Sequence, residues 1–224
     1  MNQIKDLRQF SKSLNVSMTT FDDFVSKYPR MYLNPMILEE RNLNVTSLDI
    51  FSRLLMDRIL FLGSEINSDV ANILTAQMLW LSQQGSSDIQ LYVNSPGGSV
   101  YDGMQIIDTM NFVDCDVVTT CLGCAASMGA VIFSNGAKGK RSIIEHGRFM
   151  IHQPIGGTGR SQASDIEIIS KEINKLKTEL YEILSNNSKL SIEEIEKKSD
   201  RDCWMTSKEC LDMGFADKII SKNG

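Results

Sequence analysis

The chain of 224 residues is notable first for what it has little of. No stretch approaches the ~20 consecutive apolar residues of a membrane-spanning helix. The net charge is −5 and the basic residues form no stripe, which argues against nucleic acid as the main partner. Five cysteines, an odd number, fit a reducing compartment better than a disulfide framework. Because the N-terminus carries Asp6, Asp22 and Asp23 and lacks the apolar segment of a signal peptide, we predict a cytoplasmic globular protein.

Histidine is equally scarce, because His146 and His152 are the only two. Residues 125–130 read Ala-Ala-Ser-Met-Gly-Ala, one residue away from the Gly-Xaa-Ser-Xaa-Gly turn that lifts a nucleophilic serine clear of the backbone. Ser127 is therefore a candidate nucleophile. A serine hydroxyl needs a base within hydrogen-bond reach, and only the two histidines can supply one. A serine hydrolase is the leading interpretation.

The acid of a catalytic triad must come late in the chain. An α/β-hydrolase has its triad in the order serine, acid, histidine, but no aspartate lies between Ser127 and His152. Glu145 is too close in sequence to both histidines to orient either. Further on, a Ser-Asp-Arg-Asp run offers Asp200 and Asp202. Composition does not choose between these two aspartates.

Each of these motifs also has an ordinary structural explanation. Ser-Pro-Gly-Gly at 95–98 commonly forms a simple turn. The small residues at 125–130 suit tight packing, a single histidine is more often structural than catalytic, and the Asp-Arg-Asp run suits a solvated ion pair. Cys121 and Cys124 have the spacing of half a zinc site, but no further ligands follow, and we predict a buried strand there. No single motif favours catalysis. The serine, histidine, glycine and aspartate motifs favour it because they occur together in one chain.

Taken together, the motifs resemble those of the Clp protease proteolytic subunits, the ClpP family of self-compartmentalised serine peptidases. The resemblance runs from about residue 34 to residue 220. It includes Phe-Ser-Arg-Leu-Leu-Met-Asp-Arg at 51–58, Asn-Ser-Pro-Gly-Gly-Ser-Val at 94–100, the Ser127 motif, Met-Ile-His-Gln-Pro at 150–154 and Asp-Arg-Asp at 200–202.

The resemblance implies a catalytic site. Ser127 would be the nucleophile, His152 the base and Asp202 the acid that orients it. The backbone N–H groups of Gly98 and Met128 would form the oxyanion hole. No metal and no cofactor are expected on this chain.

The resemblance also implies partners. Asp200 and Arg201 match positions that link contacts between rings to the triad, in a homo-oligomer of two stacked seven-membered rings. A Clp-type AAA+ unfoldase, similar to ClpX, ClpA or ClpC, would dock in an apolar pocket formed by Leu79, Trp80, Tyr92, Phe112 and Ile220. From the sequence alone these five would count as core residues, because large apolar side chains are mostly buried.

Hydrophobic periodicity predicts an α/β fold. Helical patterns cover Val70–Ser82, Gly103–Phe112 and Ser127–Phe133, and strand patterns cover Ile89–Val93, Val117–Leu122 and Arg148–Ile151. The resemblance sharpens this to the ClpP/crotonase-type fold of repeated β-β-α units with a protruding handle helix.

Both ends of the chain carry further expectations. After Pro154, Ser164 and Asp165 are expected to cap an amphipathic helix with apolar residues at Ile166, Ile169, Ile173, Leu176, Leu180 and Ile183. It packs on its own domain or, as the resemblance implies, forms the handle at 155–186 that interlocks the two rings. Residues 34–224 would form one peptidase domain with an axial loop region at 34–50, and residues 1–33 would be a propeptide.

The expected function is endoproteolysis of proteins that the ATPase unfolds and delivers, with short peptides cleaved without ATP. Two other classes share parts of the pattern. A crotonase-type acyl-CoA enzyme uses an oxyanion hole without a Ser-His-Asp set, and a catalytically silent ring subunit would lack a triad member. The complete set Ser127, His152 and Asp202 speaks against both.

Overall fold

The computed structural model describes residues 36–41, 44–157, 159 and 161–221. The chain divides into two compact units, residues 1–50 and 51–224. In the first unit, β1 (Met36–Arg41) and β2 (Asn44–Asp49) pair as an antiparallel hairpin within the expected axial loop region. The expected propeptide, residues 1–33, lies outside the described residues.

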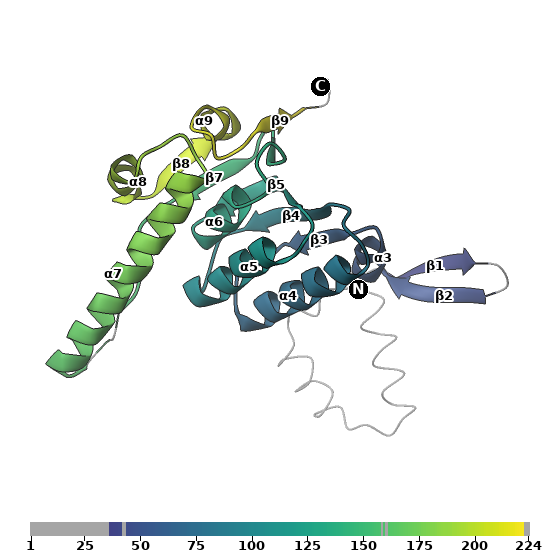
Figure 1. The fold of residues 1–224 in the computed structure, drawn as a ribbon, viewed down its shortest axis with the longest axis horizontal. Coiled ribbons are helices and arrows are strands. Elements are labelled where there is room, and N and C mark those ends of the chain that lie inside the picture. The colour runs from purple at the N-terminus through teal and green to yellow at the C-terminus, as the bar shows by residue number, and fades with distance from the viewer. Residues whose placement is uncertain (1–35, 42–43, 158, 160, 222–224) are drawn as a thin grey trace, which may run out of the picture. The chain divides into compact units, whose positions relative to one another are not determined.

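A seven-stranded sheet organises the second unit (Figure 1). Its main path runs in the order β3 (Ile59–Leu62), β4 (Ile89–Ser95), β5 (Val117–Ala126), β6 (Ser142–Ile144) and β9 (Lys218–Ile220), all parallel. β7 (Arg148–Ile151) pairs in parallel with the end of β5, and β8 (Cys203–Thr206) pairs antiparallel with β7. The motifs that contain Ser127, His152 and Asp202 therefore lie where β5, β7 and β8 meet.

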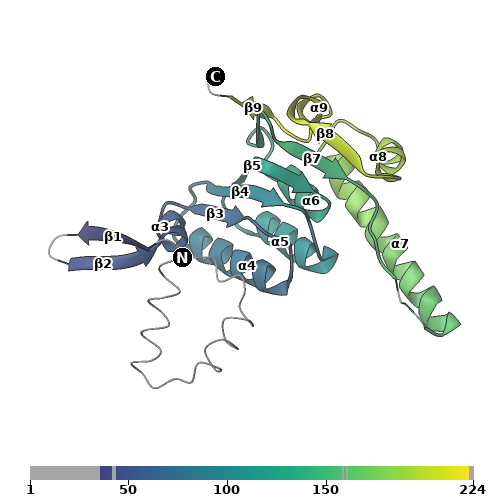
Figure 2. The same ribbon diagram turned by 180° about the vertical axis from the view of Figure 1, so that it is seen from behind.

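Three helices cover one face of this sheet, as the two opposite views show (Figures 1 and 2). They are α4 (Ser68–Gln83), α5 (Val100–Phe112) and α6 (Met128–Ser134). The short helix α3 (Ile50–Met56) precedes them in the chain. After them come α7 (Ala163–Asn186), α8 (Ile192–Ser199) and α9 (Ser207–Asp212). The α/β prediction is confirmed. In detail, α5 begins at Val100, three residues before its predicted start, with Ser99 as its N-cap, and Ile73 of the α4 stripe is exposed.

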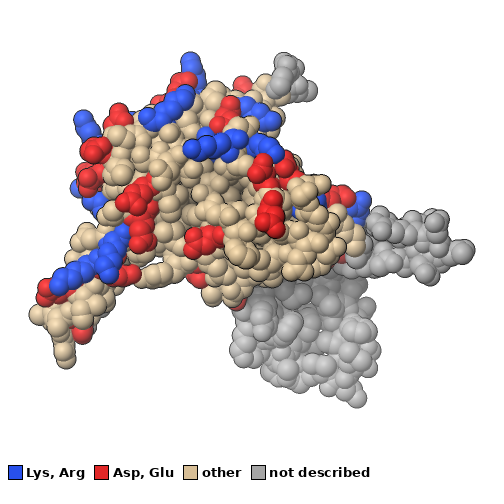
Figure 3. Space-filling view, in the orientation of Figure 1, with Lys and Arg blue, Asp and Glu red and all other residues tan. Residues whose placement is uncertain are grey.

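α7 (Ala163–Asn186) is apolar at both ends but buried at only one. Leu180, Tyr181 and Leu184 are buried, whereas Ile166 and Ile169 in its first turns are exposed. Ser164 and Asp165 do not cap it as expected; Gln162 is the N-cap and makes no side-chain cap bond. The sequence predicts a later start for α7, because Ser and Asp are typical N-cap residues. In the structure, both residues lie inside the first turn of the helix. Charges of both signs line its outer surface (Figure 3), including the Lys171–Glu167 pair.

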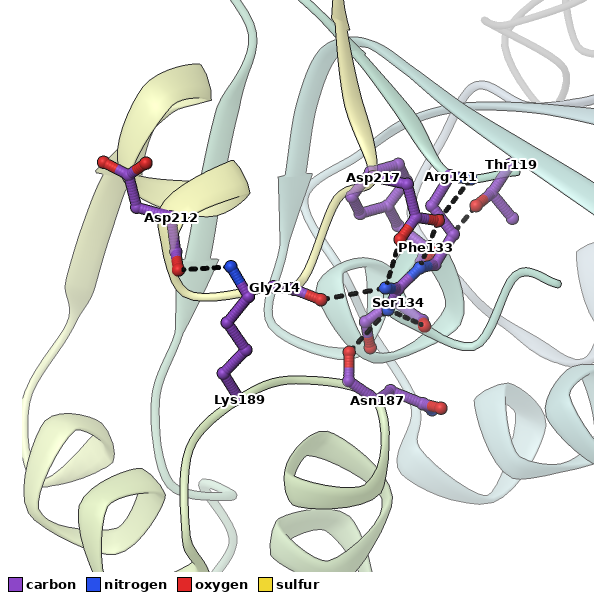
Figure 4. A network of polar contacts seen from close by, with 9 residues as sticks. All are labelled: Thr119, Phe133, Ser134, Arg141, Asn187, Lys189, Asp212, Gly214 and Asp217. Atoms are coloured by element: carbon purple, nitrogen blue, oxygen red, sulfur yellow. Dashed lines mark hydrogen bonds and ion pairs between the residues drawn. The ribbon is translucent and has the colours of Figure 1, made fainter. Parts of the chain in front are cut away.

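A buried arginine joins the C-terminal part of the sheet to the end of α7 (Figure 4). Arg141 is 5% exposed and binds Asp217 in a bidentate pair, Nη2 to Oδ1 at 2.7 Å and Nε to Oδ2 at 2.9 Å. It also donates to the carbonyl oxygens of Ser134, Asn187 and Gly214. Every polar hydrogen direction of the guanidinium is thereby used, which a buried charge requires.

The Asp217 carboxyl also makes this pair sensitive to pH. Burial raises its pKa, but the hydrogen bonds and charge of Arg141 outweigh burial, so the pKa is lowered overall. A carboxyl with a lowered folded-state pKa adds stability above its ordinary pKa of ~3.9. That stability is lost as the pH falls through the folded-state pKa.

Within the described part of the chain, no helix combines the length and apolarity needed to cross a membrane.

Candidate active site

Ser127 occupies a strained turn between a strand and a helix. β5 ends at Ala126 and α6 begins at Met128, and Ser127 between them has φ 53° and ψ −127°. A residue with a side chain rarely adopts such a backbone, which costs on the order of 1–3 kcal/mol. The backbone N–H of Ser127 donates to Met150 O at 2.9 Å, which holds the turn against β7. The turn has the geometry that presents a hydroxyl away from the sheet.

The small residues of the two glycine-containing motifs make this turn possible. A Cβ atom on Gly97 would lie 2.6 Å from Ser127 Cβ and 2.8 Å from Ala126 O, and Gly97 itself has φ 98°. A Cβ atom on Gly129 would approach Ser95 O to 3.0 Å. The 95–98 segment and the Ser127 turn therefore pack backbone to backbone. Neither is a simple surface turn.

His152 follows directly after β7, next to the strand that carries Ser127. Its Nε2 atom lies 2.8 Å from Ser127 Oγ, a normal hydrogen-bond distance. The imidazole is half-buried, with a side-chain exposure of 17%. His146, the other histidine, is exposed in the turn between β6 and β7. The structure thus brings only one histidine to Ser127.

The pairing of β7 with β8 explains which aspartate reaches His152. The two strands are in register from Arg148 opposite Thr206 to Ile151 opposite Cys203. One step further, His152 and Asp202 face each other, and Nδ1 and Oδ1 are 3.2 Å apart. The Asp200 carboxylate instead lies 3.9 Å from Arg201 Nη1. Geometry therefore selects Asp202, where composition left both aspartates open.

These three side chains form one line of hydrogen bonds. An Asp202 carboxylate can only accept, so it holds the proton of His152 on Nδ1. Nε2 is then free to accept the hydroxyl proton of Ser127.

The backbone around Gly98 is held by Ile66 on one side. Ile66 N donates to Gly97 O at 2.8 Å, and Ser99 N donates to Ile66 O at 2.9 Å. Because successive peptide groups of an extended chain point to opposite sides, the N–H of Gly98 points away from Ile66. Gly98 and Met128, the first residue of α6, both line the cavity beside Ser127.

A cavity of about 230 Å³ opens beside Ser127 and His152. Its remaining wall is almost entirely apolar and comes from α5, α6, β7 and α7, with Val100, Val131, Ile151, Leu180, Tyr181 and Leu184. Tyr181 is buried, which raises its pKa, and Lys177 beside it partly offsets that rise. Tyr181 and Leu184 were missed by the sequence reasoning, although their three-residue spacing on a predicted helix was a usable signal.

Burial disfavours the thiolate form of Cys121 and Cys124. Burial raises the pKa of the Cys121 thiol to about 12, and burial also raises the pKa of Cys124. A thiol needs a lowered pKa to act as a nucleophile or metal ligand. Among the described residues, no group of three side chains is placed to hold a metal ion. The predicted buried strand at Val117–Leu122 is present and extends to Ala126.

The five residues expected to form a docking pocket are mostly exposed. Leu79 is 37% exposed, Trp80 47%, Phe112 77% and Ile220 41%, so these four do not belong to the core. Tyr92 is half-buried and stacks on Phe61, with ring centroids 5.3 Å apart. Within one chain Ile220 stands apart from the other four, because β9 is separated from β4 by β5 and β6.

Arg201 extends into solvent. Its side chain is 86% exposed, and Nη1 donates to Asp200 O at 2.9 Å within the same turn.

Comparison with known proteins extends the match to almost the whole chain. The family model described as Clp protease matches residues 41–223. The ATP-dependent Clp protease proteolytic subunit of Bacteroides fragilis (strain YCH46) is 52% identical over 219 residues, 97% of this chain and 99% of that protein. That of Porphyromonas gingivalis is 48% identical over 224 residues, 100% of this chain and 99% of that protein.

A third relative matches over a shorter part of the chain. The ATP-dependent Clp protease proteolytic subunit 3 of Parasynechococcus marenigrum is 53% identical over 174 residues, 77% of this chain and 87% of that protein. The resemblance found from the sequence motifs is confirmed. The chain belongs to the Clp protease family of serine peptidases.

Proposed function

We propose that this chain is the peptide-cleaving subunit of a compartmentalised protease, with Ser127 as nucleophile, His152 as base and Asp202 as orienting acid. The observation that carries the proposal is the line of hydrogen bonds from Ser127 Oγ through His152 to Asp202, 2.8 Å and 3.2 Å long, at the mouth of an apolar cavity. A serine and a histidine in this relation, with a carboxylate behind, are the parts that acyl transfer requires.

The reaction follows from the placement of these groups. His152 Nε2 takes the proton of Ser127 as Oγ attacks the carbonyl carbon of the scissile peptide bond. The resulting imidazolium, stabilised by Asp202, then gives that proton to the leaving amine, which leaves an acyl-enzyme. Water activated by the same histidine releases the second product. Acid–base help of this kind contributes roughly 100- to 10,000-fold in rate.

Two backbone donors would stabilise the oxyanion formed during attack. The N–H groups of Gly98 and Met128 both border the cavity next to Ser127. Loss of one such donor elsewhere costs about 2.7–4 kcal/mol. A Cβ atom on Gly98 would lie 2.2 Å from Ile66 O, so only glycine lets the backbone occupy this position.

The cavity indicates which peptide bonds are accepted. Its apolar wall, which includes Val100 and Leu184, can contact an apolar side chain of the substrate. Among the described residues, that wall has no carboxylate, lysine or arginine that could pair with a charged side chain of the substrate. A buried charge without a partner is costly. We expect an apolar residue before the cleaved bond.

Labelling with a fluorophosphonate probe tests the proposal. An active serine peptidase should be labelled on Ser127 and should hydrolyse a fluorogenic peptide that has an apolar residue at the cleavage site. Absence of labelling in a correctly folded protein would instead favour a crotonase-type acyl-CoA enzyme or a silent ring subunit.

The proposed assembly is a homo-oligomer of two stacked seven-membered rings in the cytoplasm. α7 supports it, because its first turns expose Ile166, Ile168 and Ile169, which one chain alone leaves in contact with water. All five cysteines are free, as in a reducing compartment. The curated relatives are named as subunits of an ATP-dependent protease.

In the proposed assembly, Arg201 pairs across the interface between the rings, and loss of one partner of a pair buried in this way commonly costs about 3–5 kcal/mol. Arg201→Ala should therefore yield smaller assemblies with roughly tenfold lower peptidase activity. Within one chain Arg201 is 86% exposed, so its removal should leave the isolated fold intact. Native mass and steady-state peptide hydrolysis measure the two effects. Lys197→Ala, an exposed cation in the last turn of α8, serves as control. A fully assembled and fully active Arg201 variant would refute the link between rings and triad.

A Clp-type AAA+ unfoldase, similar to ClpX, ClpA or ClpC, is the proposed partner. The exposure of Leu79, Trp80 and Phe112 supports an apolar docking surface. Because Ile220 lies apart from them within one chain, a pocket that contains all five residues needs Ile220 from a neighbouring copy.

Tyr92→Ala should leave hydrolysis of short peptides nearly unchanged and strongly reduce ATP-dependent degradation of a folded protein. The triad is untouched and only the anchor for the partner is lost. Phe112→Ala is the matched variant, because a side chain that is 77% exposed can be truncated with little loss of packing. Equal loss of both activities in the Tyr92 variant alone would mean that its stacking on Phe61 supports the fold.

We also propose that residues 1–33 are a propeptide. Self-cleavage by Ser127 would then give an active protein with a new N-terminus near residues 32–36, whereas the Ser127→Ala protein would keep its original start. Intact-mass measurement separates the two states. A fully active complex that contains the complete 25.1 kDa chain would contradict the idea.

A further inference from the structure

The contact between His152 and Asp202 is the weaker half of the triad. It spans 3.2 Å, against 2.8 Å between His152 and Ser127. The Asp202 side chain is 62% exposed, and among the described residues its carboxylate has His152 as its sole hydrogen-bond partner. An exposed carboxylate with one partner is not fixed by its own contacts. The position of the Asp202 carboxylate must therefore be fixed by the backbone that carries it.

That backbone belongs to a turn, residues 199–202, that starts at the last residue of α8 and leads into β8. The β7–β8 ladder ends where Ile151 faces Cys203. A continued ladder would place Gln153 opposite Arg201. Instead, Gln153 N donates to Ser199 O at 2.8 Å, two residues further back, so the turn bulges between the two attachments. Asp202 lies at the edge of this bulge.

A side chain from the segment just after β7 also reaches the bulge. Gln153 Nε2 donates to Asp200 O at 3.2 Å, and the same carbonyl accepts Arg201 Nη1 at 2.9 Å. The Arg201 bond stays within the turn and ties it to nothing else. Ser199 Oγ, although buried, has no hydrogen-bond partner in the described structure. Among the described residues, Gln153 therefore makes both hydrogen bonds that tie residues 199–200 to the segment carrying His152.

We propose that Gln153 is a positioning residue whose side-chain amide holds the 199–202 turn so that Asp202 stays in reach of His152; this rests on the triad proposed above. Gln153 does not line the cavity beside Ser127. Its loss should therefore lower kcat and leave KM unchanged. The backbone bond to Ser199 persists in any variant, so the loss is partial.

The variants are Gln153→Met, which keeps the length of the side chain without a donor, and Gln153→Glu, which keeps its shape and places a carboxylate near Asp200 O. Loss of one hydrogen bond predicts roughly five- to tenfold lower kcat for the methionine variant. The glutamate variant should show a larger loss of kcat, because its carboxylate and the Asp200 carbonyl oxygen are both hydrogen-bond acceptors and repel each other. Gln162→Met is the control, since Gln162 makes no side-chain cap bond.

A double-mutant cycle with Asp202→Asn separates positioning from general support of the fold. If Gln153 acts through Asp202, Gln153→Met should cost nothing further, within about twofold, in the Asp202→Asn background. The rate of fluorophosphonate labelling of Ser127 gives a readout even for slow variants. Native mass and thermal midpoint show whether assembly and folding are kept.

Parent activity in Gln153→Met would overturn the inference. So would an equal fold-loss in both backgrounds, or a loss explained by smaller assemblies. Each of these results leaves the triad standing as long as the parent protein labels on Ser127. Failure of the parent to label would remove the proposed function itself.

Discussion

Replacement of Ser127 by alanine should lower peptide hydrolysis by about 10⁴-fold or more, since a triad without its nucleophile keeps only the catalysis that binding and the oxyanion donors supply. The change removes one oxygen atom. The backbone bond from residue 127 to Met150 O does not depend on the side chain, so the turn should persist. Steady-state hydrolysis of a fluorogenic peptide, with native mass to confirm assembly, measures the effect.

Ser134→Ala provides a matched control for this variant. Ser134 is the last residue of α6, the helix that begins directly after Ser127, and its hydroxyl donates to Val131 O at 2.9 Å. Its loss removes an equal volume from the same helix and should cost about 1 kcal/mol of stability with activity retained. Activity of the Ser127 variant within tenfold of the parent would sink the assignment of the nucleophile.

The parts of the site that could be predicted are those encoded by short segments. The turn around Ser127 needs small residues beside it for a local steric reason, and the sequence 125–130 meets that need in one stretch. His152 was selected mainly because the chain has only two histidines. Residue scarcity and turn chemistry act over a few residues, which is why both candidates could be found without a structure.

The acid shows where local reasoning stops. Asp200 and Asp202 are two residues apart in the same turn, and both are exposed. What distinguishes them is the register of β7 against β8, which places position 202 opposite position 152. Register is set by long-range pairing of two strands about fifty residues apart in the sequence. The resemblance to the family supplied what composition did not.

The cavity and the buried ion pair are long-range in the same sense. Tyr181 and Leu184 join the site only because the C-terminal half of α7 folds back onto α6. Arg141 and Asp217 are separated by 76 residues, and neither lies in a motif. Helix ends were also misjudged: Asn67 and Ser99 cap α4 and α5 with side-chain bonds, whereas α7 begins without one. A capping residue is only a local preference, and packing decides where a helix starts.

The strain at Ser127 has a consistent structural origin. A residue at φ 53° persists only when its surroundings fix it. Here, β5 ends just before Ser127, α6 starts just after it, and Gly97 packs so closely against the turn that a Cβ atom there would lie 2.6 Å from Ser127 Cβ. The same packing brings Gly98 to the mouth of the cavity. The turn that exposes the hydroxyl and the segment of Gly98, one of the two proposed oxyanion donors, are therefore one packed unit.

Replacement of His152 by alanine should be nearly as severe as loss of Ser127, with peptide hydrolysis reduced about 10⁴-fold or more, because members of a triad act as a unit. For the same reason the double variant of Ser127 and His152 should be no slower than either single variant. His146→Ala is the matched control within the same chain. His146 is exposed in the turn between β6 and β7 and does not line the cavity, so hydrolysis should stay within about twofold of the parent.

Peptide hydrolysis by the two histidine variants, compared at equal assembly, decides the identity of the base. His152 Nε2 already lies 2.8 Å from Ser127 Oγ, so no rearrangement is needed for proton transfer. If the effects were reversed, with His146→Ala inactive and His152→Ala active, the turn at residues 145–147 would have to move to Ser127 in the working enzyme. The pairing of β7 with β5 and β8 would then have to break, because this pairing is what fixes His152 between Ser127 and Asp202.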